Sequence, residues 1–273
     1  MRLRVADLDR ERDFYRRAIG LRDLGEEAGA IRLGVDGVPI VELVSSPGAA
    51  PRPPRTTGLF HMAILVPARA ALARALARLA SGRRRLSGAS DHLVSEALYL
   101  TDPEGNGIEI YRDRPRSEWR YDGGSLQMST LPLDLDDLLA DLDRAESPDG
   151  GMPAGTRVGH VHLNVAHLGE AERFYAGLLG FDVTVRGYPG ALFLSTGGYH
   201  HHIGVNTWAG AGAPAPPKGS RGLVWFELGV RGAAAVDELR RRVAEAGSEI
   251  EDTEGGFRTR DPSGNGLVIR SSS

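Results

Sequence analysis

The sequence predicts an α+β protein built from four similar strand–helix–strands units. Two pairs of repeated segments carry this prediction. Residues 5–21 and 165–181 each read as the end of a strand followed by a helix that has a Phe-Tyr pair on its buried side and a glycine stop. The segments Asp102-Pro-Glu-Gly-Asn-Gly and Asp261-Pro-Ser-Gly-Asn-Gly each read as a turn that joins two strands.

The repeats place the four units and the segments that separate them. The units are expected at residues 1–48, 57–113, 157–208 and 222–271. Helices are predicted at about 67–81 and 232–246 in the second and fourth units. We therefore expect an N-terminal domain over residues 1–113 and a C-terminal domain over 157–273. The join at 114–156 contains an amphipathic segment, residues 133–142, that predicts a helix.

Composition excludes several classes of protein. The chain has 273 residues, of which 41% are hydrophobic and 25% charged, as is usual for a soluble globular protein. A net charge of −3 without a basic stripe argues against a nucleic-acid partner, and no apolar run is long enough to cross a membrane. With no cysteine there is neither a disulfide nor a thiolate ligand. A cytoplasmic location is the resulting expectation.

One hairpin brings together side chains that suit a metal site. Residues 95–100 and 107–111 read as two strands around the Asp102 turn, so Tyr99 and Glu109 are expected side by side. His92 lies shortly before the first strand. A tyrosine that can hydrogen-bond a ligand oxygen, next to a hard oxygen donor, suits a metal that holds an oxygenated substrate.

These motifs resemble a known superfamily. The four units, the Phe-Tyr helix and the Asp-Pro-x-Gly-Asn turn are similar to those of the vicinal oxygen chelate superfamily, whose βαβββ modules pair into curved mixed-sheet barrels around a metal. The hairpin resembles the pattern of type I extradiol dioxygenases, and the chain resembles bacterial catechol-2,3-dioxygenase-like proteins of four modules. The matching positions are His92, Leu98-Tyr99, Asp102-Pro103, Gly105 and Glu109, with Ser90 as a slight departure at the small residue that opens the pattern.

The resemblance implies a metal centre and its ligands. His61, on the first strand of the second unit, and His160, on the first strand of the third, match the two ligating histidines, and Glu109 matches the carboxylate ligand. Two imidazoles and one carboxylate form the facial arrangement that leaves open positions on Fe(II). Fe(II) is therefore the expected metal, with Mn(II) or another divalent ion as the alternative and dioxygen as co-substrate.

The resemblance also implies the catalytic residues. His201 matches the acid–base histidine that accepts a substrate proton and returns one during cleavage. Tyr99 is expected to donate a hydrogen bond to a substrate oxygen, and His92 to support the ring-opening intermediate. The run from Tyr199 to Val205 is expected on the last strand of the third unit, where alternation puts His200 and His202 on the face opposite His201. A shift of one residue would exchange that assignment. His162 is expected either to support the site or to belong to the core, and His200 and His202 are candidates for the same supporting role.

The fourth and first units depart from the pattern of the superfamily. Trp225, Arg258 and Val268 stand where the fourth unit would need the ligand His, the Tyr and the ligand Glu. In the first unit the position that matches His160 falls one residue before Met1, from which we expect an upstream start. The second unit is therefore expected to pair with the third, within one chain or between two, to complete the site. The first and fourth would enclose a second, metal-free cavity near Trp225.

The predicted function is an extradiol ring-cleaving dioxygenase that acts on a catechol or hydroquinone-type aromatic diol. A glyoxalase-type metal-dependent isomerase or lyase on the same fold is one alternative, because a fold does not determine a reaction. A protein that binds an aromatic drug or metabolite without catalysis is another. The expected partner is the small aromatic diol, and exposed sheet edges in this superfamily also allow a homodimer.

Overall fold

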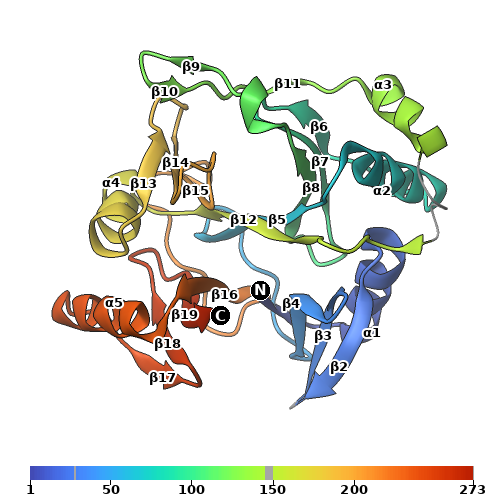
Figure 1. The fold of residues 1–273 in the computed structure, drawn as a ribbon. Coiled ribbons are helices and arrows are strands. Elements are labelled where there is room, and N and C mark those ends of the chain that lie inside the picture. The colour runs from blue at the N-terminus through green and yellow to red at the C-terminus, as the bar shows by residue number, and fades with distance from the viewer. Residues whose placement is uncertain (28, 145–149, 273) are drawn as a thin grey trace. The chain divides into compact units, whose positions relative to one another are not determined.

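A computed structural model describes residues 1–27, 29–144 and 150–272 of the chain, and its ribbon is drawn in Figure 1. The order of elements repeats four times as one strand, one helix and three strands. Each repeat begins and ends within a few residues of the unit predicted from the sequence. The predicted α+β fold of four βαβββ modules is therefore confirmed.

The first two modules contain β1 to β8. The first has β1 (Arg2–Val5), α1 (Leu8–Phe14), β2 (Arg22–Glu27), β3 (Ala30–Val35) and β4 (Val38–Ser45). The second has β5 (Gly58–Leu65), α2 (Arg69–Ser81), β6 (Gly88–Asp91), β7 (Ser95–Thr101) and β8 (Gly107–Asp113). In the join that follows are β9 (Tyr121–Asp122), β10 (Ser125–Leu126), β11 (Leu131–Pro132) and α3 (Leu135–Leu139), so the helix predicted at 133–142 is present.

The last two modules repeat the same order. The third has β12 (Arg157–Asn164), α4 (Leu168–Glu172), β13 (Asp182–Val185), β14 (Ala191–Ser195) and β15 (Ile203–Asn206). The fourth has β16 (Gly222–Arg231), α5 (Ala233–Glu245), β17 (Glu251–Thr253), β18 (Gly256–Arg260) and β19 (Gly266–Ser272). Helices α1 and α4 each continue as a π-helix, over Tyr15–Ile19 and Arg173–Leu178.

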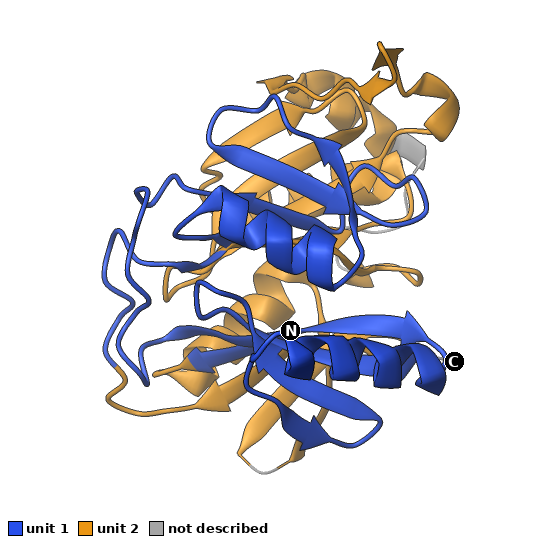
Figure 2. Ribbon diagram, turned by 90° about the vertical axis from the view of Figure 1, so that its left-hand side faces the viewer, with its two compact units in different colours: residues 1–4, 50–59, 162–273 blue, residues 5–49, 60–161 orange. Residues whose placement is uncertain are grey.

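The chain divides into two compact units, shown in different colours in Figure 2. Unit 1 contains residues 1–4, 50–59 and 162–273, and unit 2 contains residues 5–49 and 60–161. Unit 2 thus holds most of the first two modules and the join, and unit 1 holds most of the last two. The division into domains at residues 113 and 157 stays a prediction from the sequence.

The first strand of each module pairs with a strand from another module. In unit 2 the strand order β11-β6-β7-β8-β5-β12 puts the start of β12 next to β5. In unit 1, β1 is antiparallel to β16, with Leu3 opposite Leu223. The first strands of the second and third modules are therefore neighbours, which is the contact that the predicted metal site requires.

The two repeated sequence motifs meet in a buried hydrogen bond. The Tyr15 hydroxyl, on the first helix, donates to Asp102 Oδ2 at 3.1 Å in the turn of the next module. The Tyr175 hydroxyl donates to Asp261 Oδ2 at 3.0 Å in the same way. The amide of Asn106 donates to Asp102 Oδ1 at 2.8 Å and so closes the turn. Both motifs therefore fasten a helix to a turn, which is a structural task.

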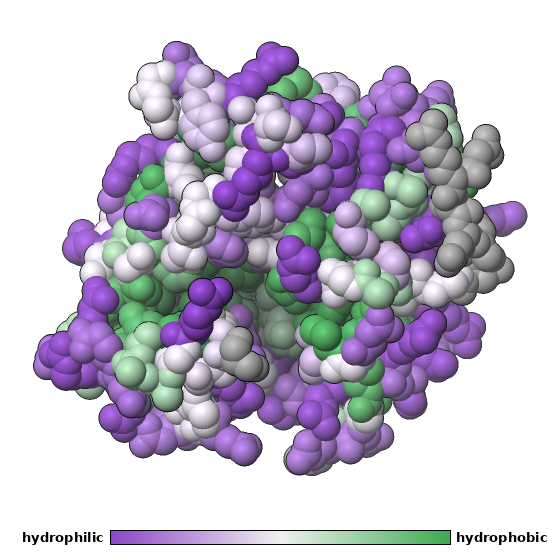
Figure 3. Space-filling model, viewed as in Figure 1, coloured by the Kyte–Doolittle hydropathy of each residue, from purple (hydrophilic) through white to green (hydrophobic). Residues whose placement is uncertain are grey.

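Helix α2 shows how apolar side chains are covered. Five of its six buried residues lie along one face at helical spacing, namely Ala71, Leu72, Ala75, Leu76 and Leu79. Figure 3 shows mostly hydrophilic residues on the face in view, with apolar patches between them. Among the residues that the structure describes, no helix is long and apolar enough to cross a membrane.

Candidate metal centre

The β7–β8 hairpin sets the position of Glu109. The strands are antiparallel with Tyr99 directly opposite Glu109, as the sequence predicted. Strand β5 runs parallel to β8 on its other side and places Ala63 opposite Glu109 and His61 opposite Gly107. Because side chains alternate between the two faces of a strand, His61 and Glu109 lie on the same face of the sheet.

Glycine at position 107 allows β5 and β8 to approach closely. A Cβ atom there would lie 3.1 Å from the His61 Cβ and would overlap the backbone carbonyl of Phe60. Only glycine fits this contact without a shift of the backbone. The close approach brings the His61 ring to the carboxylate of Glu109.

Three ligand atoms meet within unit 2. Glu109 Oε2 lies 3.0 Å from His61 Nε2 and 3.1 Å from His160 Nε2, which β12 supplies. The three side chains are buried, and one ligand atom of each lies within 4.8 Å of the others. Within residues 1–27, 29–144 and 150–272, this is the one group of at least three His, Cys, Asp or Glu residues with such a geometry.

The charge of Glu109 is stabilised by the two histidines. Burial acts to raise the pKa of this carboxyl, but the charge interaction and hydrogen bond of His160 and those of His61 outweigh it. The pKa of Glu109 therefore lies well below its usual value, and the group is a carboxylate at neutral pH.

The donor set fits a divalent transition metal. It offers two imidazole nitrogens and one anionic oxygen, the ligands of a non-haem iron site with open positions. Adjacent ligands around an ion with bonds of about 2.1 Å lie about 3 Å apart, as the Glu109 oxygen does from both imidazole nitrogens. His61, Glu109 and His160 are thus positioned to hold one ion.

His92, in the loop before β7, forms a hydrogen-bonded pair with Tyr99 on β7. His92 Nε2 lies 2.6 Å from the Tyr99 hydroxyl, and His92 Nδ1 lies 2.7 Å from the carbonyl oxygen of Ser129. A carbonyl can only accept, so His92 Nδ1 carries a hydrogen. In neutral His92 the Nε2 atom then accepts the hydrogen bond from Tyr99. The Tyr99 ring also lies 5.6 Å from the His61 ring, between centroids.

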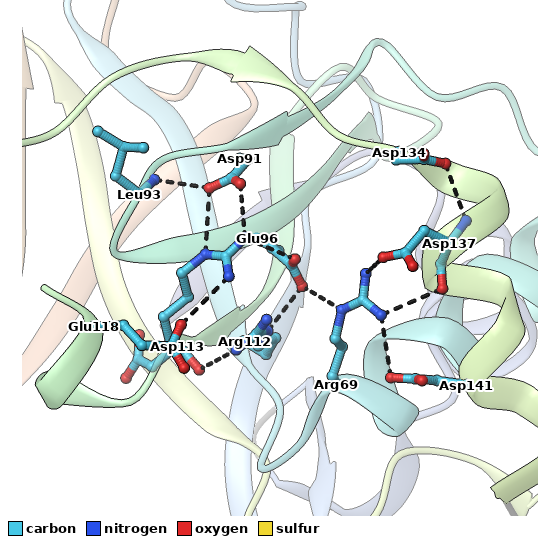
Figure 4. A network of polar contacts seen from close by, with 11 residues as sticks. Arg69, Asp91, Leu93, Glu96, Arg112, Asp113, Glu118, Asp134, Asp137 and Asp141 are labelled. Atoms are coloured by element: carbon cyan, nitrogen blue, oxygen red, sulfur yellow. Dashed lines mark hydrogen bonds and ion pairs between the residues drawn. The ribbon is translucent and has the colours of Figure 1, made fainter.

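A buried ionic network holds the hairpin from the opposite face of β7 (Figure 4). The carboxylate of Glu96 is 2% exposed and accepts hydrogen bonds from Arg69 Nε at 2.9 Å, Arg112 Nε at 2.8 Å and Arg114 Nη2 at 3.0 Å. Arg114 also bonds Asp91, the residue before His92, at 2.7 Å. The network therefore ties the loop that carries His92 to the strand that carries Tyr99.

The histidine triplet differs from its prediction. Strand β15 begins at Ile203, so His200, His201 and His202 precede it. The chain turns at Gly197 and Gly198, both with positive φ, and Ile203 is the first residue paired with β14, opposite Leu194. The expectation that these histidines lie on the last strand of the module was therefore wrong, and strand alternation does not assign their faces.

The histidines of unit 1 contact neighbouring imidazole and aromatic rings. His200 Nδ1 and His201 Nδ1 lie 2.7 Å apart, so one ring donates a hydrogen bond to the other, and both are buried. The ring of His162, on β12, lies 5.7 Å from that of Phe193 and 5.3 Å from that of Trp208, between centroids. The roles of His162, His200, His201 and His202 stay predictions from the sequence.

The fourth module has the same strand register as the second without its ligands. Arg258 lies opposite Val268, as Tyr99 lies opposite Glu109. Gly266 faces the Trp225 Cβ, as Gly107 faces that of His61. The predicted alignment of this module is therefore correct, and its indole, guanidinium and isopropyl groups do not form a metal site. A second cavity near Trp225 stays a prediction.

A comparison with protein families decides the relationship. The profile of the Glyoxalase/Bleomycin resistance protein/Dioxygenase superfamily matches residues 1–110 and 157–269. The chain belongs to this superfamily. The resemblance seen in the Phe-Tyr helix and the Asp-Pro-x-Gly-Asn turn is thereby confirmed, and glyoxalase-superfamily modules account for all four repeats.

Individual relatives of the superfamily agree with this. A Bacillus subtilis (strain 168) protein named catechol-2,3-dioxygenase is 43% identical over 266 residues, which span 96% of this chain and 92% of that protein. A solved putative dioxygenase from Bacillus subtilis has a TM-score of 0.65 at 14% identity, with 99% of this chain and 83% of that chain covered. Zea mays glyoxalase I has a TM-score of 0.58 at 16% identity, with 98% and 89% covered. At such identities the two structures show the fold alone.

Two features of the site were not predicted from the sequence. The Ser129 carbonyl that orients His92 lies in an irregular segment 37 residues away in the chain, and no pattern marks it. The Glu96 network carries a signal that could have been used, because Glu96 and Arg112 occupy cross-strand positions of the predicted hairpin.

Replacement of Glu109 by Ala should remove most of the metal affinity. Glu109 is the only anionic ligand of the set, and even partners outside the ligand set change metal affinity by about 10–100-fold, so a loss of at least about 100-fold is expected. Metal content after dialysis, together with titration of the apoprotein, measures the effect. Glu118→Ala, which removes a more exposed carboxylate, serves as the control and should keep its metal. Full occupancy in Glu109→Ala would exclude Glu109 as a ligand.

Proposed function

We propose that this protein is a metal-dependent extradiol ring-cleaving dioxygenase that acts on a catechol or hydroquinone-type aromatic diol. The observation that carries the proposal is the group of His61, Glu109 and His160 within unit 2. With Fe(II) this donor set has a net charge of about +1 and open positions for a chelating diol and dioxygen. The 43% identity to a protein named catechol-2,3-dioxygenase supports the same reaction.

The metal and the residues of the chain have separate tasks in this proposal. A bound Fe(II) supplies Lewis-acid polarisation of the diol hydroxyls and one-electron chemistry with dioxygen. His61, His160 and Glu109 hold the ion, and the burial of all three keeps bulk water from their ligand atoms. Cleavage of the ring bond next to the diol gives a semialdehyde.

Tyr99 and His92 form a path that can accept a proton from the diol. With neutral His92, the Tyr99 proton points to Nε2, so the Tyr99 oxygen accepts a hydrogen bond from a diol hydroxyl. The diol proton can pass to Tyr99 as the Tyr99 proton passes to His92 Nε2. The Ser129 carbonyl accepts from Nδ1–H and stabilises the resulting imidazolium. Once His92 is charged, Tyr99 can donate to the substrate oxygen, the role expected from the sequence.

We assign the second acid–base role to His201, on the strength of the sequence resemblance. It would accept a substrate proton and return one during cleavage. The adjacent ring of His200, in hydrogen-bond contact with His201 Nδ1, would set which nitrogen of His201 carries a hydrogen. His162 and His202 would support the same region.

Oxygen uptake tests the reaction. The apoprotein is loaded with Fe(II) without air, mixed with catechol, and monitored with an oxygen electrode and by absorbance for a yellow ring-opened product. We expect one dioxygen consumed per diol, and Glu109→Ala serves as the inactive control. Loading with Mn(II) tests the alternative metal. A preparation with full Fe(II) occupancy that consumes no dioxygen with catechol or hydroquinone would contradict the proposal.

The same assay separates the other functions that this superfamily allows. A glyoxalase-type isomerase or lyase would turn over its substrate with Ni(II), Zn(II) or Mn(II) in the absence of dioxygen. A protein that only binds aromatic compounds would retain a ligand after removal of metal. Neither result is expected for a ring-cleaving enzyme.

Replacement of Tyr99 by Phe should slow turnover by about 10²-fold, the lower range for a positioned acid–base group, and leave the metal in place. The ring still packs against His61, so the loss is confined to the hydroxyl that bonds His92. Single-turnover kinetics and metal content measure the two properties. Tyr121→Phe, at an exposed position, is the control. A Tyr99→Phe enzyme with wild-type kinetics would remove Tyr99 from the proton path.

Replacement of His201 by Ala should abolish ring cleavage while metal content stays unchanged. The expected reason is the loss of the group that takes and returns the substrate proton. A variant with His202→Ala, at the next residue of the same loop, should retain most of the wild-type activity because His202 is the least buried of the triplet. If His200→Ala or His202→Ala loses cleavage and His201→Ala does not, the acid–base residue has been assigned to the wrong histidine.

A further inference from the structure

Glu11 is a buried acidic residue that the proposed reaction does not use. It lies on α1 within unit 2 and is 0% exposed to solvent. Neither oxygen of its side chain has a hydrogen-bond partner among the residues that the structure describes. Burial of an ionised carboxylate without hydrogen bonds is costly, so its environment must be explained.

The neighbours of Glu11 are themselves acidic and accept several hydrogen bonds. Burial nevertheless raises the pKa of Asp102 above its usual value. Asp102 accepts hydrogen bonds from the Asn106 amide at 2.8 Å, from Asn106 Nδ2 at 2.8 Å, from the Glu104 amide at 3.0 Å and from the Tyr15 hydroxyl at 3.1 Å. Glu104 accepts from the amides of Ala6 and Asp7 at 2.8 and 2.9 Å.

The groups that act on the Glu11 charge come from α1 and from the β7–β8 turn. Asp102 and Glu104, in the turn, oppose the charge, and Arg10, an exposed residue of α1, favours it. Tyr15, just beyond α1, is a buried phenol that already donates to Asp102. The Glu104 amide faces Glu11 but donates to Asp102 Oδ1. Two acidic side chains therefore face Glu11, and the cation lies on the solvent side.

The internal repeat provides a comparison. In the third and fourth modules, Ala171 stands in the place of Glu11 and Ser263 in the place of Glu104. The hydroxyl of Ser263 accepts from the Ala166 amide at 2.9 Å, as Glu104 does from Ala6, and Tyr175 bonds Asp261 as Tyr15 bonds Asp102. The same helix-to-turn contact thus forms without either glutamate, so Glu11 is not needed to build it.

We propose that the folded protein holds the Glu11 carboxyl in its protonated form, and that loss of this proton in alkaline solution loosens the contact between α1 and the β7–β8 turn. The proton leaves to solvent base, and the new carboxylate then faces Asp102 and Glu104 in a buried position. The turn connects the strand of Tyr99 to that of Glu109. The packing of α1 against this hairpin therefore depends on pH.

The direction of the pKa shift agrees with this geometry. Burial, followed by repulsion from Asp102 and then from Glu104, raises the pKa of Glu11 from 4.5 to about 9. Between these two values the folded protein binds one more proton at this residue than the unfolded chain. Stability must therefore fall as pH rises, with the folding equilibrium constant decreasing by about tenfold per pH unit. Above the folded pKa this loss ends, because both states are then charged.

Urea unfolding of the full chain between pH 5 and 10 tests the proposal. Glu11→Gln keeps the shape of the protonated acid but cannot lose a proton, so its stability should lack the tenfold decrease per pH unit seen in the wild type. Glu11→Ala, which copies Ala171, should behave like Glu11→Gln. Asp9→Asn removes an exposed carboxylate from the same helix and should keep the wild-type slope. Parallel pH profiles for the wild type and Glu11→Gln would overturn the proposal.

Infrared spectroscopy gives an independent measurement of the proton. The difference spectrum of wild type minus Glu11→Gln at pH 7 should contain the carbonyl band of a protonated carboxylic acid, and this band should disappear above about pH 9. A carboxylate band in its place at pH 7 would overturn the proposal. Stabilisation of the wild type by Na⁺ or Ca²⁺ at fixed pH that is absent in Glu11→Gln would also overturn it, since a cation would then neutralise the site.

Discussion

The buried charge of Glu109 is the constraint on which the candidate centre depends. An ionised carboxylate that is 2% exposed is stable only if nearby groups replace its lost hydration. Two strands from distant parts of the sequence supply those groups, β5 with His61 and β12 with His160. Removal of either histidine would leave a buried charge without full compensation. The charge of Glu109 therefore requires that β8 pack closely against β5 and that β12 lie beside β5.

The four modules share a scaffold and differ in chemistry. The hydrogen bonds from Tyr15 to Asp102 and from Tyr175 to Asp261 show that the motifs most visible in the sequence fasten helices to turns. The strand register of the second module is repeated in the fourth, yet the inward positions hold Trp225 and Val268 there. A repeated backbone therefore leaves side chains free to diverge, and this is why the fold of the superfamily does not specify a reaction.

Local features of the site could be predicted from the sequence, whereas features that depend on distant contacts could not. The Asp102 turn and the alternation of strand residues were enough to place Tyr99 opposite Glu109. Glu109 and His160 are 51 residues apart in the chain, and their approach needs β12 to lie next to β5, on the side away from β8. Only the resemblance to the superfamily indicated this. The triplet was misplaced because a run of histidines carries no signal for where β15 begins, and the paired residues start only at Ile203. The acceptor for His92 is a backbone carbonyl, which any residue type provides.

Glu109 and Glu11 show how one residue type acquires opposite properties in a single unit. Both are buried, so loss of hydration raises the pKa of each. Two imidazoles face Glu109 and lower its pKa well below the usual value, while two acidic side chains face Glu11 and raise its pKa further, to about 9. The β7–β8 hairpin separates these environments, with Glu109 on its second strand and Asp102 and Glu104 in its turn. Two imidazoles stabilise the charge of Glu109 on one strand of the hairpin, and a proton on Glu11 keeps the contact at the turn compact. The groups around each glutamate, rather than burial itself, therefore determine what it does.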